Sequence, residues 1–541
     1  MTRPRWWPAA LVLLLGALSL ARTWLTGDSI RQARVIETIV VSAGVVILLV
    51  AWLALFSRLP RRTRLGGSAL ALAVLALVPT FFRIRGVTGD LRPILEPRFG
   101  RSTALPEPAA PTPPTESLPA PVAAVASPSR GASPTHVSAP ASPKPVEPTA
   151  AAVAPDFPAF PQFLGPSRDG TLAGPRLARD WTRHPPRRLW RQPLGQGWSG
   201  FAISGGIAVT QEQRGDEERV VAYDVKSGRP LWSHADRARY ETVIAGIGPR
   251  ATPTIDGASV YAMGATGILN GLDLTTGKRR WSRDVLQETN AELPEWGRSC
   301  SPLVVDGRVV VIAGGSGGRR LVAYHAASGE PAWAAGEGGA SYSSPTLVTL
   351  SGRRQLVVLN QASVSGHDPA TGAVLWEHAF PREQPNVAMP LALDADRLLV
   401  SAGYGVGSKA YRVSETGGVL HATLEWESPR LKSKFANLLV HDGFVYGLDD
   451  GVLTCLDPAS GERRWKSGRH GHGQLLLVAG LLLVQTEEGE LVLVDPSPEA
   501  YRELTRFTAL AGKTWNPPAL AGSLLLVRND REAAAYELPV D

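Results

Sequence analysis

The sequence predicts an all-β fold: an eight-bladed β-propeller of four-stranded antiparallel blades, preceded by transmembrane helices and a disordered linker. Three observations support this prediction. A phrase of turn residues and tryptophan recurs along residues 158–541, three apolar runs occupy the first hundred residues, and a proline-rich stretch lies between the two regions. A chain of 541 residues is too long for one ordinary core, so several regions are expected.

Residues 1–98 are predicted to form a membrane anchor with about three transmembrane helices, at residues 6–24, 35–56 and 65–82. A helix needs about 20 apolar residues to cross the hydrocarbon core. Four arginines, Arg58, Arg61, Arg62 and Arg64, lie between the second and third runs, and positive loops stay in the cytoplasm. We therefore expect a multi-pass protein of the cytoplasmic (inner) membrane with its C-terminal domain on the extracytoplasmic, periplasmic side. A cleavable signal peptide is the alternative interpretation of the first run.

The positive charge of the chain lies in this first region. Residues 1–100 hold thirteen arginines, no lysine and four acidic residues, a net charge of +9, while the whole chain is +7, which leaves −2 for the remainder. A nucleic-acid-binding protein carries its basic excess on the folded domain. We therefore expect no nucleic-acid partner.

Residues 99–157 are predicted to be a disordered linker. Residues 101–160 contain 15 of the 45 prolines, and no aromatic residue occurs from 101 to 156. Such a segment cannot bury enough apolar surface to offset the entropy cost of ordering it. Proline-rich linkers are extended and semi-rigid, so we expect this one to hold the following domain away from the bilayer.

The recurring phrase places Gly four residues and Trp eight residues after an Asp. The five copies, one of which has His in place of Asp, begin at Asp224, Asp273, His325, Asp368 and Asp457. The Asp side chain can close an Asx turn, and Gly supplies the positive φ that the turn requires. The Trp then begins the next strand and packs between neighbouring sheets.

The number of blades follows from the spacing of the anchor aromatics. They are separated by 39 to 52 residues, which is the length of one four-stranded blade. The anchors are Trp190, Trp232, Trp281, Trp333, Trp376, Trp426, Trp465 and Phe507. The last blade lacks one strand, and the strand around Trp190 has no blade before it. We expect this strand to complete the last blade, which gives eight blades and removes exposed sheet edges.

The repeat phrase resembles that of pyrroloquinoline-quinone (PQQ)-type propellers. That superfamily includes quinoprotein alcohol dehydrogenases and the outer-membrane assembly scaffold of the β-barrel assembly machinery. Residues 160–170 (FPQFLGPSRDG) are similar to the lead-in of exported members, but Phe160 and Leu164 stand where Trp and Arg are usual, and residues 248–281 match best. The resemblance covers residues 160–541 and implies the fold, while the superfamily contains both enzymes and scaffolds.

No motif predicts catalysis. The dehydrogenases that the phrase resembles typically carry adjacent cysteines, a Ca²⁺ site and an Asp base, whereas Cys300 and Cys455 are far apart here and the long insertions that build those active sites are missing. His470 and His472 lack a third metal ligand, which favours a solvated loop. We expect no catalytic residue, no metal site and no cofactor, with PQQ as the alternative.

A candidate site for a ligand or partner lies at one mouth of the central channel. The loops that lead into the innermost strands carry aligned prolines, so their preceding residues are expected to converge there. A positive mouth with flat aromatic surfaces suits an anionic small molecule or an acidic peptide segment. The alternative is that these groups pair with nearby acids and backbone carbonyls. The candidates are Arg250, Arg298, Tyr342, Asn386, Lys434, Asn437, Trp515 and Asn516.

The function expected from these features is a membrane-anchored, extracytoplasmic binding or scaffold module without catalytic activity. Its partners would be envelope proteins, peptide segments or a small ligand. The alternatives are a PQQ-dependent quinoprotein dehydrogenase and a PQQ-binding sensor.

Overall fold

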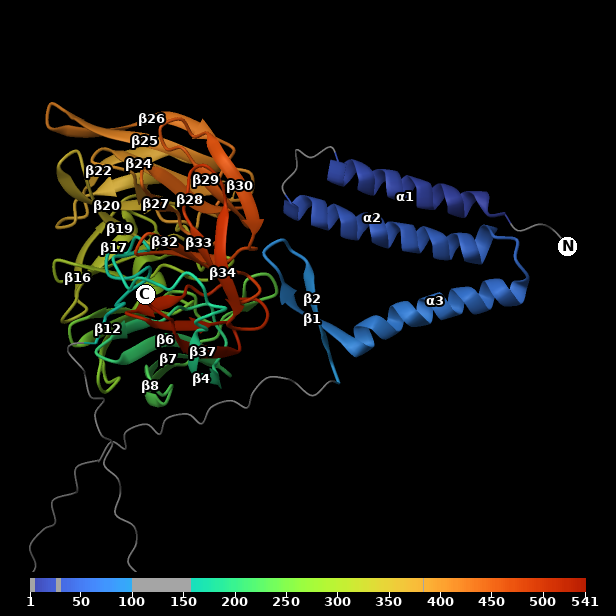
Figure 1. Cartoon of the computed structure of the whole chain (residues 1–541), viewed down its shortest axis with the longest axis horizontal. Coiled ribbons are helices and arrows are strands. Elements are labelled where there is room, and N and C mark those ends of the chain that lie inside the picture. The colour runs from blue at the N-terminus through green and yellow to red at the C-terminus, as the bar shows by residue number, and fades with distance from the viewer. Residues whose placement is uncertain (1–4, 26–30, 100–156, 383) are drawn as a thin grey trace, which may run out of the picture.

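A bundle of three long helices lies beside a ring of β-sheets (Figure 1). The computed structural model describes residues 5–25, 31–99, 157–382 and 384–541. The predicted linker, residues 99–157, lies outside the described residues except for its two end residues.

The three helices are long and apolar enough to cross a membrane. They are α1 (Trp7–Leu25), α2 (Arg31–Ala51), which continues into the π-helical turn η1 (Trp52–Phe56), and α3 (Arg61–Phe81). Only 6% of the most apolar stretch of α2–η1 is buried within the chain. Most of its apolar surface is therefore free to contact the hydrocarbon core of a membrane. The arginine-rich turn between η1 and α3 lies at the end of the bundle away from the ring of sheets (Figure 1).

Eight four-stranded antiparallel blades form the ring, which confirms the predicted fold. In seven of them the four blade strands follow one another in the sequence from the innermost to the outermost. The strands are β5 (Ala202–Ser204), β6 (Ile207–Arg214), β7 (Glu217–Asp224) and β8 (Pro230–Asp236) in the first blade; β11 (Thr254–Asp256), β12 (Ser259–Met263), β13 (Ile268–Asp273) and β14 (Arg279–Asp284) in the second; β15 (Leu303–Val305), β16 (Arg308–Gly315), β17 (Arg319–His325) and β18 (Pro331–Ala335) in the third; β19 (Thr346–Leu350), β20 (Arg353–Leu359), β21 (Ser363–His367) and β22 (Val374–Ala379) in the fourth; β23 (Leu391–Ala392), β24 (Arg397–Ala402), β25 (Gly407–Thr416) and β26 (Val419–Ser428) in the fifth; β27 (Leu439–His441), β28 (Phe444–Asp449), β29 (Val452–Leu456) and β30 (Arg463–Arg469) in the sixth; β31 (Gln474–Val478), β32 (Leu481–Gln485), β33 (Glu490–Asp495) and β34 (Arg502–Thr508) in the seventh; and β35 (Ala519–Ala521), β36 (Leu524–Arg528), β37 (Glu532–Glu537) and β4 (Arg187–Pro193) in the eighth.

The ring closes as predicted, because β4 is the outermost strand of the eighth blade. It pairs antiparallel with β37, and Trp190 lies opposite Ala535. The short strand β3 (Thr171–Leu172) adds to the seventh blade in parallel with β31. The first two strands after residue 157, β3 and β4, therefore belong to the last two blades, which joins the two ends of the propeller.

The repeat phrase forms the turn that was predicted for it. In the copy that begins at Asp273, its Oδ1 accepts hydrogen bonds from the backbone N–H groups of Thr275 (3.1 Å) and Thr276 (3.0 Å). Gly277 has φ +70°, and the glycines of the other four copies have φ between +71° and +76°. The Trp of one blade packs on the turn of the next, as Trp232 does on Gly277. The phrase thus shapes a turn and also docks adjacent blades.

Small elements occupy the loops between blades. The strands β9 (Glu241–Thr242) and β10 (Gly246–Ile247) form a short ribbon, and α4 (Val285–Thr289) is a single helical turn. Inner strands such as β36 are buried along their whole length because each blade is covered by two neighbours, while the outermost strands are partly exposed. The core is therefore continuous around the ring.

A β-hairpin that the sequence did not predict joins the helices to the propeller. Strand β1 (Phe82–Val87) follows α3 directly and pairs with β2 (Pro93–Pro97). The hairpin lies between the helical bundle and the ring (Figure 1). Its tip reaches the mouth of the propeller channel, where the candidate site lies.

Candidate functional site

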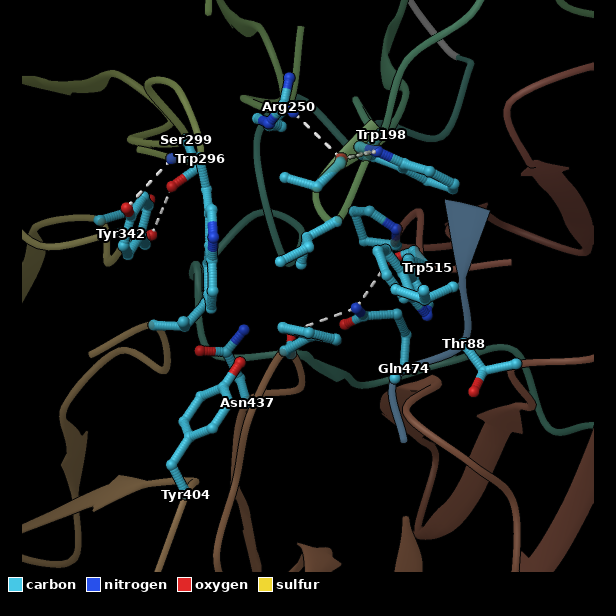
Figure 2. Close-up of a pocket in the computed structure, with 18 of the residues that line it drawn as sticks. Thr88, Trp198, Arg250, Trp296, Ser299, Tyr342, Tyr404, Asn437, Gln474 and Trp515 are labelled. Carbon is cyan, nitrogen blue, oxygen red and sulfur yellow. Dashed lines mark hydrogen bonds between the residues drawn. The ribbon is translucent and has the colours of Figure 1, made fainter. Parts of the chain in front are cut away.

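A cavity of about 240 Å³ lies at the channel mouth that faces the hairpin. Four of the eight predicted site residues line it: Arg250, Tyr342, Asn437 and Trp515. They come from loops that precede the innermost strands of four different blades. The structure therefore brings half of the predicted residues together around one space (Figure 2).

Two other predicted residues, Arg298 and Asn386, do not line the cavity but are buried among backbone carbonyls. The guanidinium of Arg298 donates to the carbonyls of Ile312 (3.3 Å) and Ala313, and burial lowers its pKa to about 10. The side-chain amide of Asn386 donates to the carbonyl of Asn360 (3.0 Å). For these two residues, the structure agrees with the alternative reading, in which the polar groups satisfy local backbone.

Lys434 and Asn516 also lie outside the cavity. The ammonium of Lys434 forms an ion pair with Asp450 at 3.3 Å. The side-chain amide of Asn516 donates to the carbonyls of Gly197 (3.1 Å) and Ser199 (2.8 Å), which tie the eighth blade to the first. Only one of the three predicted cations, Arg250, faces the cavity. The mouth therefore carries less positive charge than the sequence suggested.

Aromatic side chains form most of the cavity wall. On one side the rings of Trp198 and Phe435 each lie 4.9 Å from the ring of Trp515, measured between centroids. On the other side Trp296 stacks on Tyr342 at 5.2 Å. These two groups of rings face each other across an open space (Figure 2).

The ring geometry is held by backbone and amide groups. The Ala245 carbonyl accepts hydrogen bonds from Trp198 Nε1 at 2.7 Å and from Arg250 Nη2 at 3.0 Å. The amide of Gln474 donates to the carbonyl of Trp515 at 2.8 Å. Such bonds orient the cavity wall before any ligand binds, which favours binding because less ordering is needed.

Arg250 supplies the charge of the cavity. Its guanidinium lies 4.2 Å over the ring of Tyr240 and donates to neutral carbonyls, among them those of Ala245 and Gly246. Burial lowers the pKa of Arg250 to about 10, which still leaves it protonated at neutral pH. The group is therefore a partly buried cation whose hydrogen-bond partners here are all neutral.

The lead-in segment forms the floor of the cavity. Phe163 lines the cavity from below the mouth loops. The neighbouring Arg168 is buried and donates to the carbonyls of Ser301 (2.5 Å), Pro302 (3.1 Å) and Pro345 (2.9 Å). Because these carbonyls precede β15 and β19, Arg168 ties the lead-in to the third and fourth blades.

The β1–β2 hairpin covers the mouth. The backbone N–H of Gly89 donates to Glu487 Oε1 at 2.5 Å, and Lys513 Nζ donates to the carbonyl of Val87 at 3.1 Å. At the base of the hairpin, ion pairs join Arg85 to Asp530 (2.6 Å) and Glu96 to Arg531 (2.7 Å). The hairpin residues that line the cavity are Val87, Thr88, Gly89 and Leu91.

Asp90 sits at the tip of this hairpin between basic side chains. It lies 2.6 Å from Arg31 at the start of α2 and 3.2 Å from His472 Nε2. Burial alone would raise the pKa of Asp90, but the hydrogen bond from His472 and the charges of His472 and Arg31 outweigh it and lower the pKa to about 2. A carboxylate of the chain itself, that of Asp90, is therefore held among basic groups beside the mouth.

The solvated loop predicted for His470 and His472 is wrong, because both side chains are buried. The pKa of His470 falls to about 4, chiefly because burial disfavours the charged ring. His472 is covered by Gly89 and bonds to Asp90, neither of which is near it in the sequence. Within the described ranges, no group of three or more His, Cys, Asp or Glu side chains could hold a metal ion.

Several residues of the site were not predicted. Trp296 and Phe435 are aromatic and stand in the same mouth loops as Arg298 and Lys434, so their position in the loop was a usable signal. Trp198 stands in the corresponding loop of the first blade, before β5, where no site residue was predicted. Tyr404 lies in the β24–β25 turn, where the sequence offers no comparable signal. The hairpin residues could not be found from the repeats because they precede them.

The comparisons with known proteins agree with the fold. A family model described as outer membrane protein assembly factor BamB matches residues 180–335 and 290–467, together more than half of the chain. Two curated relatives carry the same description: one from Moranella endobia (strain PCIT), 25% identical over 260 residues, and one from Yersinia pestis, 26% identical over 257 residues. These matches cover 45% and 44% of this chain, and 63% and 62% of the relatives.

A solved structure, BamB from Moraxella catarrhalis, is similar to 65% of this chain and 100% of its own, with 15% identity and a TM-score of 0.48. Since the family model covers more than half of the chain, this protein belongs to the PQQ-type propeller family described as outer membrane protein assembly factor BamB.

Proposed function

We propose that this protein is a membrane-anchored binding module that holds its propeller outside the cytoplasm and has no catalytic activity of its own. The observation that carries the proposal is the placement of charge along the helical bundle. Arg58, Arg61, Arg62 and Arg64 lie at the end away from the propeller, while α3 leads into the hairpin on the propeller side (Figure 1). Positive loops stay in the cytoplasm, which puts the propeller on the opposite, periplasmic side.

The proposed partners are envelope proteins. The relatives that the chain matches are described as outer membrane protein assembly factors. On the outside of the fourth and fifth blades, the neighbouring strands β22 and β26 expose aliphatic side chains at Val374 (44%), Val419 (53%) and Leu424 (40%). Exposed apolar side chains grouped on adjacent strands are typical of a protein-interaction surface.

A small ligand is proposed for the channel mouth. Arg250, Tyr342, Asn437 and Trp515 contribute to a preformed, mostly aromatic cavity with few polar groups, which is the usual character of a ligand site. The other predicted residues, Arg298, Asn386, Lys434 and Asn516, are proposed to shape the loops.

A PQQ-binding sensor is a second candidate, and the aromatic cavity is the observation that favours it. The residues do not fit a quinone held together with Ca²⁺, because the cavity lining contains Arg250 but no carboxylate. A dehydrogenase is therefore the weaker alternative. Titrating the purified chain with PQQ and Ca²⁺ separates the candidates. Dye reduction would support the enzyme, and a bound chromophore that reduces no dye would support the sensor. Absence of both binding and dye reduction would support the binding module.

The membrane orientation can be tested with C-terminal fusions. Alkaline phosphatase fused after Asp541 should be active and a cytosolic fluorescent reporter should be dark. Neutralising Arg58, Arg61, Arg62 and Arg64 together with glutamine should reduce the phosphatase activity of the fusion, because the orientation signal is lost. An active fluorescent reporter on the unaltered chain would contradict the proposal.

The partner surface can be tested by photo-crosslinking in intact cells. A photoreactive amino acid at Val374 or Val419 should capture a defined set of envelope proteins. The same amino acid at Arg183, whose side chain is 82% exposed, serves as the control. Identical adducts from all three positions would argue against a specific surface on the fourth and fifth blades.

A further inference from the structure

The cavity at the channel mouth is shared between the membrane anchor and the propeller. Its walls come from the propeller, while Val87, Gly89 and Leu91 of the hairpin and Gln32 of α2 complete it. We propose that the β1–β2 hairpin is a lid over this cavity, and that the ligand beneath it is a flat aromatic molecule with one negative charge. The proposal deepens the small-ligand site proposed above and rests on it.

The shape of the ligand follows from the facing aromatic walls. Trp198 and Trp515 stand on one side and Trp296 and Tyr404 on the other, with the open space between them (Figure 2). Aromatic rings prefer to stack with an offset or to meet edge to face, so a flat ring system gains contacts on both sides. A space of about 240 Å³ accommodates a small fused ring system.

The charge of the ligand follows from Arg250. Among the described residues that line the cavity, Arg250 carries the single formal charge. Its guanidinium bonds to the carbonyls of Ala245 and Gly246, and no carboxylate lines the cavity. The acid whose charge acts on it, Glu218, lies outside the lining. Hydrogen bonds between an arginine and an anion are stronger than those between neutral groups. One partly buried cation in an aromatic cavity therefore favours a ligand with one negative charge and disfavours a positive one.

The tip of the hairpin is held by contacts that can be exchanged with water. Gly89 bonds to Glu487, and the carboxylate of Asp90 bonds to His472 and Arg31. Gly89 also lies against the imidazole of His472, where an added Cβ would come 2.5 Å from Cγ. Any larger residue at position 89 must therefore displace the tip from its seat.

The lid and the ligand are expected to influence each other. Val87 and Leu91 face the cavity, so a ligand inside it contacts the closed lid as well as the propeller. Binding then stabilises the closed hairpin, and by thermodynamic reciprocity closure strengthens binding. Since β1 continues from α3, cavity occupancy is linked to the position of the membrane helices.

The ligand class can be tested with three probes that share one ring system. Naphthalene-2-sulfonate is the anion, 2-naphthol is neutral and naphthalen-2-ylmethylammonium is the cation. Quenching of tryptophan fluorescence in the full chain, reconstituted in neutral lipid nanodiscs, reports binding. We expect the anion to bind at least tenfold more tightly than the cation, and Arg250→Gln to remove that difference while 2-naphthol binding is kept.

The lid can be tested by stopped-flow kinetics with naphthalene-2-sulfonate. Gly89→Ala should accelerate both association and dissociation several-fold because the tip no longer seats against His472. Gly66→Ala is the matched control, since a Cβ there meets nothing within 4 Å. Equal rates in the three proteins would overturn the lid.

The remaining outcomes are equally decisive. Absence of naphthalene-2-sulfonate binding even to Gly89→Ala would overturn the ligand site, and equal affinity for the three probes would overturn the assigned charge. Photo-crosslinking at Val374 and Val419 and the fusion reporters do not depend on the cavity. If those succeed while the probes fail, the binding module stands and only this inference falls.

Discussion

The indole ring of Trp232 lies on Gly277 in the turn of the next blade, where an added Cβ would come 2.6 Å from Cδ2 of the indole. Trp232 Nε1 also donates to the carbonyl of Leu274 at 2.8 Å in that same turn. The same pairing recurs in Trp190–Gly228, Trp281–Gly329, Trp333–Gly372 and Trp426–Gly461. Each of these blades thus depends on its neighbour for the burial of its tryptophan.

Gly277→Ala should destabilise the propeller by about 2–5 kcal/mol. The positive φ costs an alanine roughly 1–2 kcal/mol, and overpacking against the indole of Trp232 adds roughly 1–3 kcal/mol. The control is Gly257→Ala, which has φ +54° and nothing within 4 Å of its added Cβ, so only the backbone cost applies. Chemical denaturation of the full chain, followed by tryptophan fluorescence, measures both. Equal losses in the two variants would show that the contact between blades contributes nothing.

Trp190→Ala should weaken the closure of the ring. Trp190 belongs to β4 in the eighth blade, while its Nε1 donates to the carbonyl of Val225 in the first blade at 3.0 Å. The indole of Trp190 is half-buried, so we expect the free energy of unfolding to fall by about 2–4 kcal/mol, somewhat less than for a fully buried tryptophan. Trp190→Phe keeps most of the ring area and should cost only about 1–1.5 kcal/mol for the lost hydrogen bond. Thermal unfolding with the same midpoint in Trp190→Ala and the unaltered chain would contradict this role.

The blades were predictable because their signal is local, whereas the site depends on contacts distant in sequence. The spacing of Asp273, Gly277 and Trp281 determines a turn and a strand within a few residues, so the blade number and its closure followed from the sequence. Aligned prolines placed the mouth loops but did not determine which way each side chain points. Lys434 therefore turned towards Asp450 instead of the cavity.

The contacts of the hairpin could not be predicted either, because they also join residues that are distant in the sequence. Nothing near Asp90 in the sequence indicates that it meets His472, because the two residues come from different parts of the chain and the pairing arises only when α3 and the propeller are placed together. This is why His472 was wrongly predicted to be solvated, whereas His470 is buried against Tyr501 of the propeller itself. The residues around Asp90 form no local pattern that would indicate such a contact.

Arg168→Met should destabilise the channel floor by about 3 kcal/mol. The guanidinium of Arg168 donates to the buried carbonyls of Ser301, Pro302 and Pro345. Its removal takes this donor from all three, and only Pro302 keeps a strong second bond, from Thr254 at 2.6 Å. The control Arg183→Met changes an arginine whose side chain is 82% exposed and should stay within about 0.5 kcal/mol of the unaltered chain. Denaturation midpoints compare the two variants. A small effect of Arg168→Met would mean that water replaces the guanidinium and that the lead-in does not lock the third and fourth blades.

Docking of the hairpin should weaken as the pH falls from about 4 towards 2. The pKa of Asp90 is about 2 when the hairpin is docked and returns to its ordinary 3.8 when it is free, so the free hairpin binds more protons in this interval. By linkage the docked state is fully stabilised by Asp90 above pH 3.8 and loses that contribution, roughly 1–2 kcal/mol, as the carboxylate is protonated.

The measurement must separate Asp90 from the groups around it. Basic groups near Asp90 are Arg31, Arg469, His472 and Lys434, and the carboxylate of Glu487 bonds to the neighbouring Gly89. Asp90→Asn is therefore the control, because it keeps all of these groups and removes only the carboxylate. Spin labels at the exposed Leu95 of the hairpin and Val419 of the propeller give a distance distribution that should broaden as the hairpin leaves. Broadening that follows the same pH course in Asp90→Asn would show that another group controls docking.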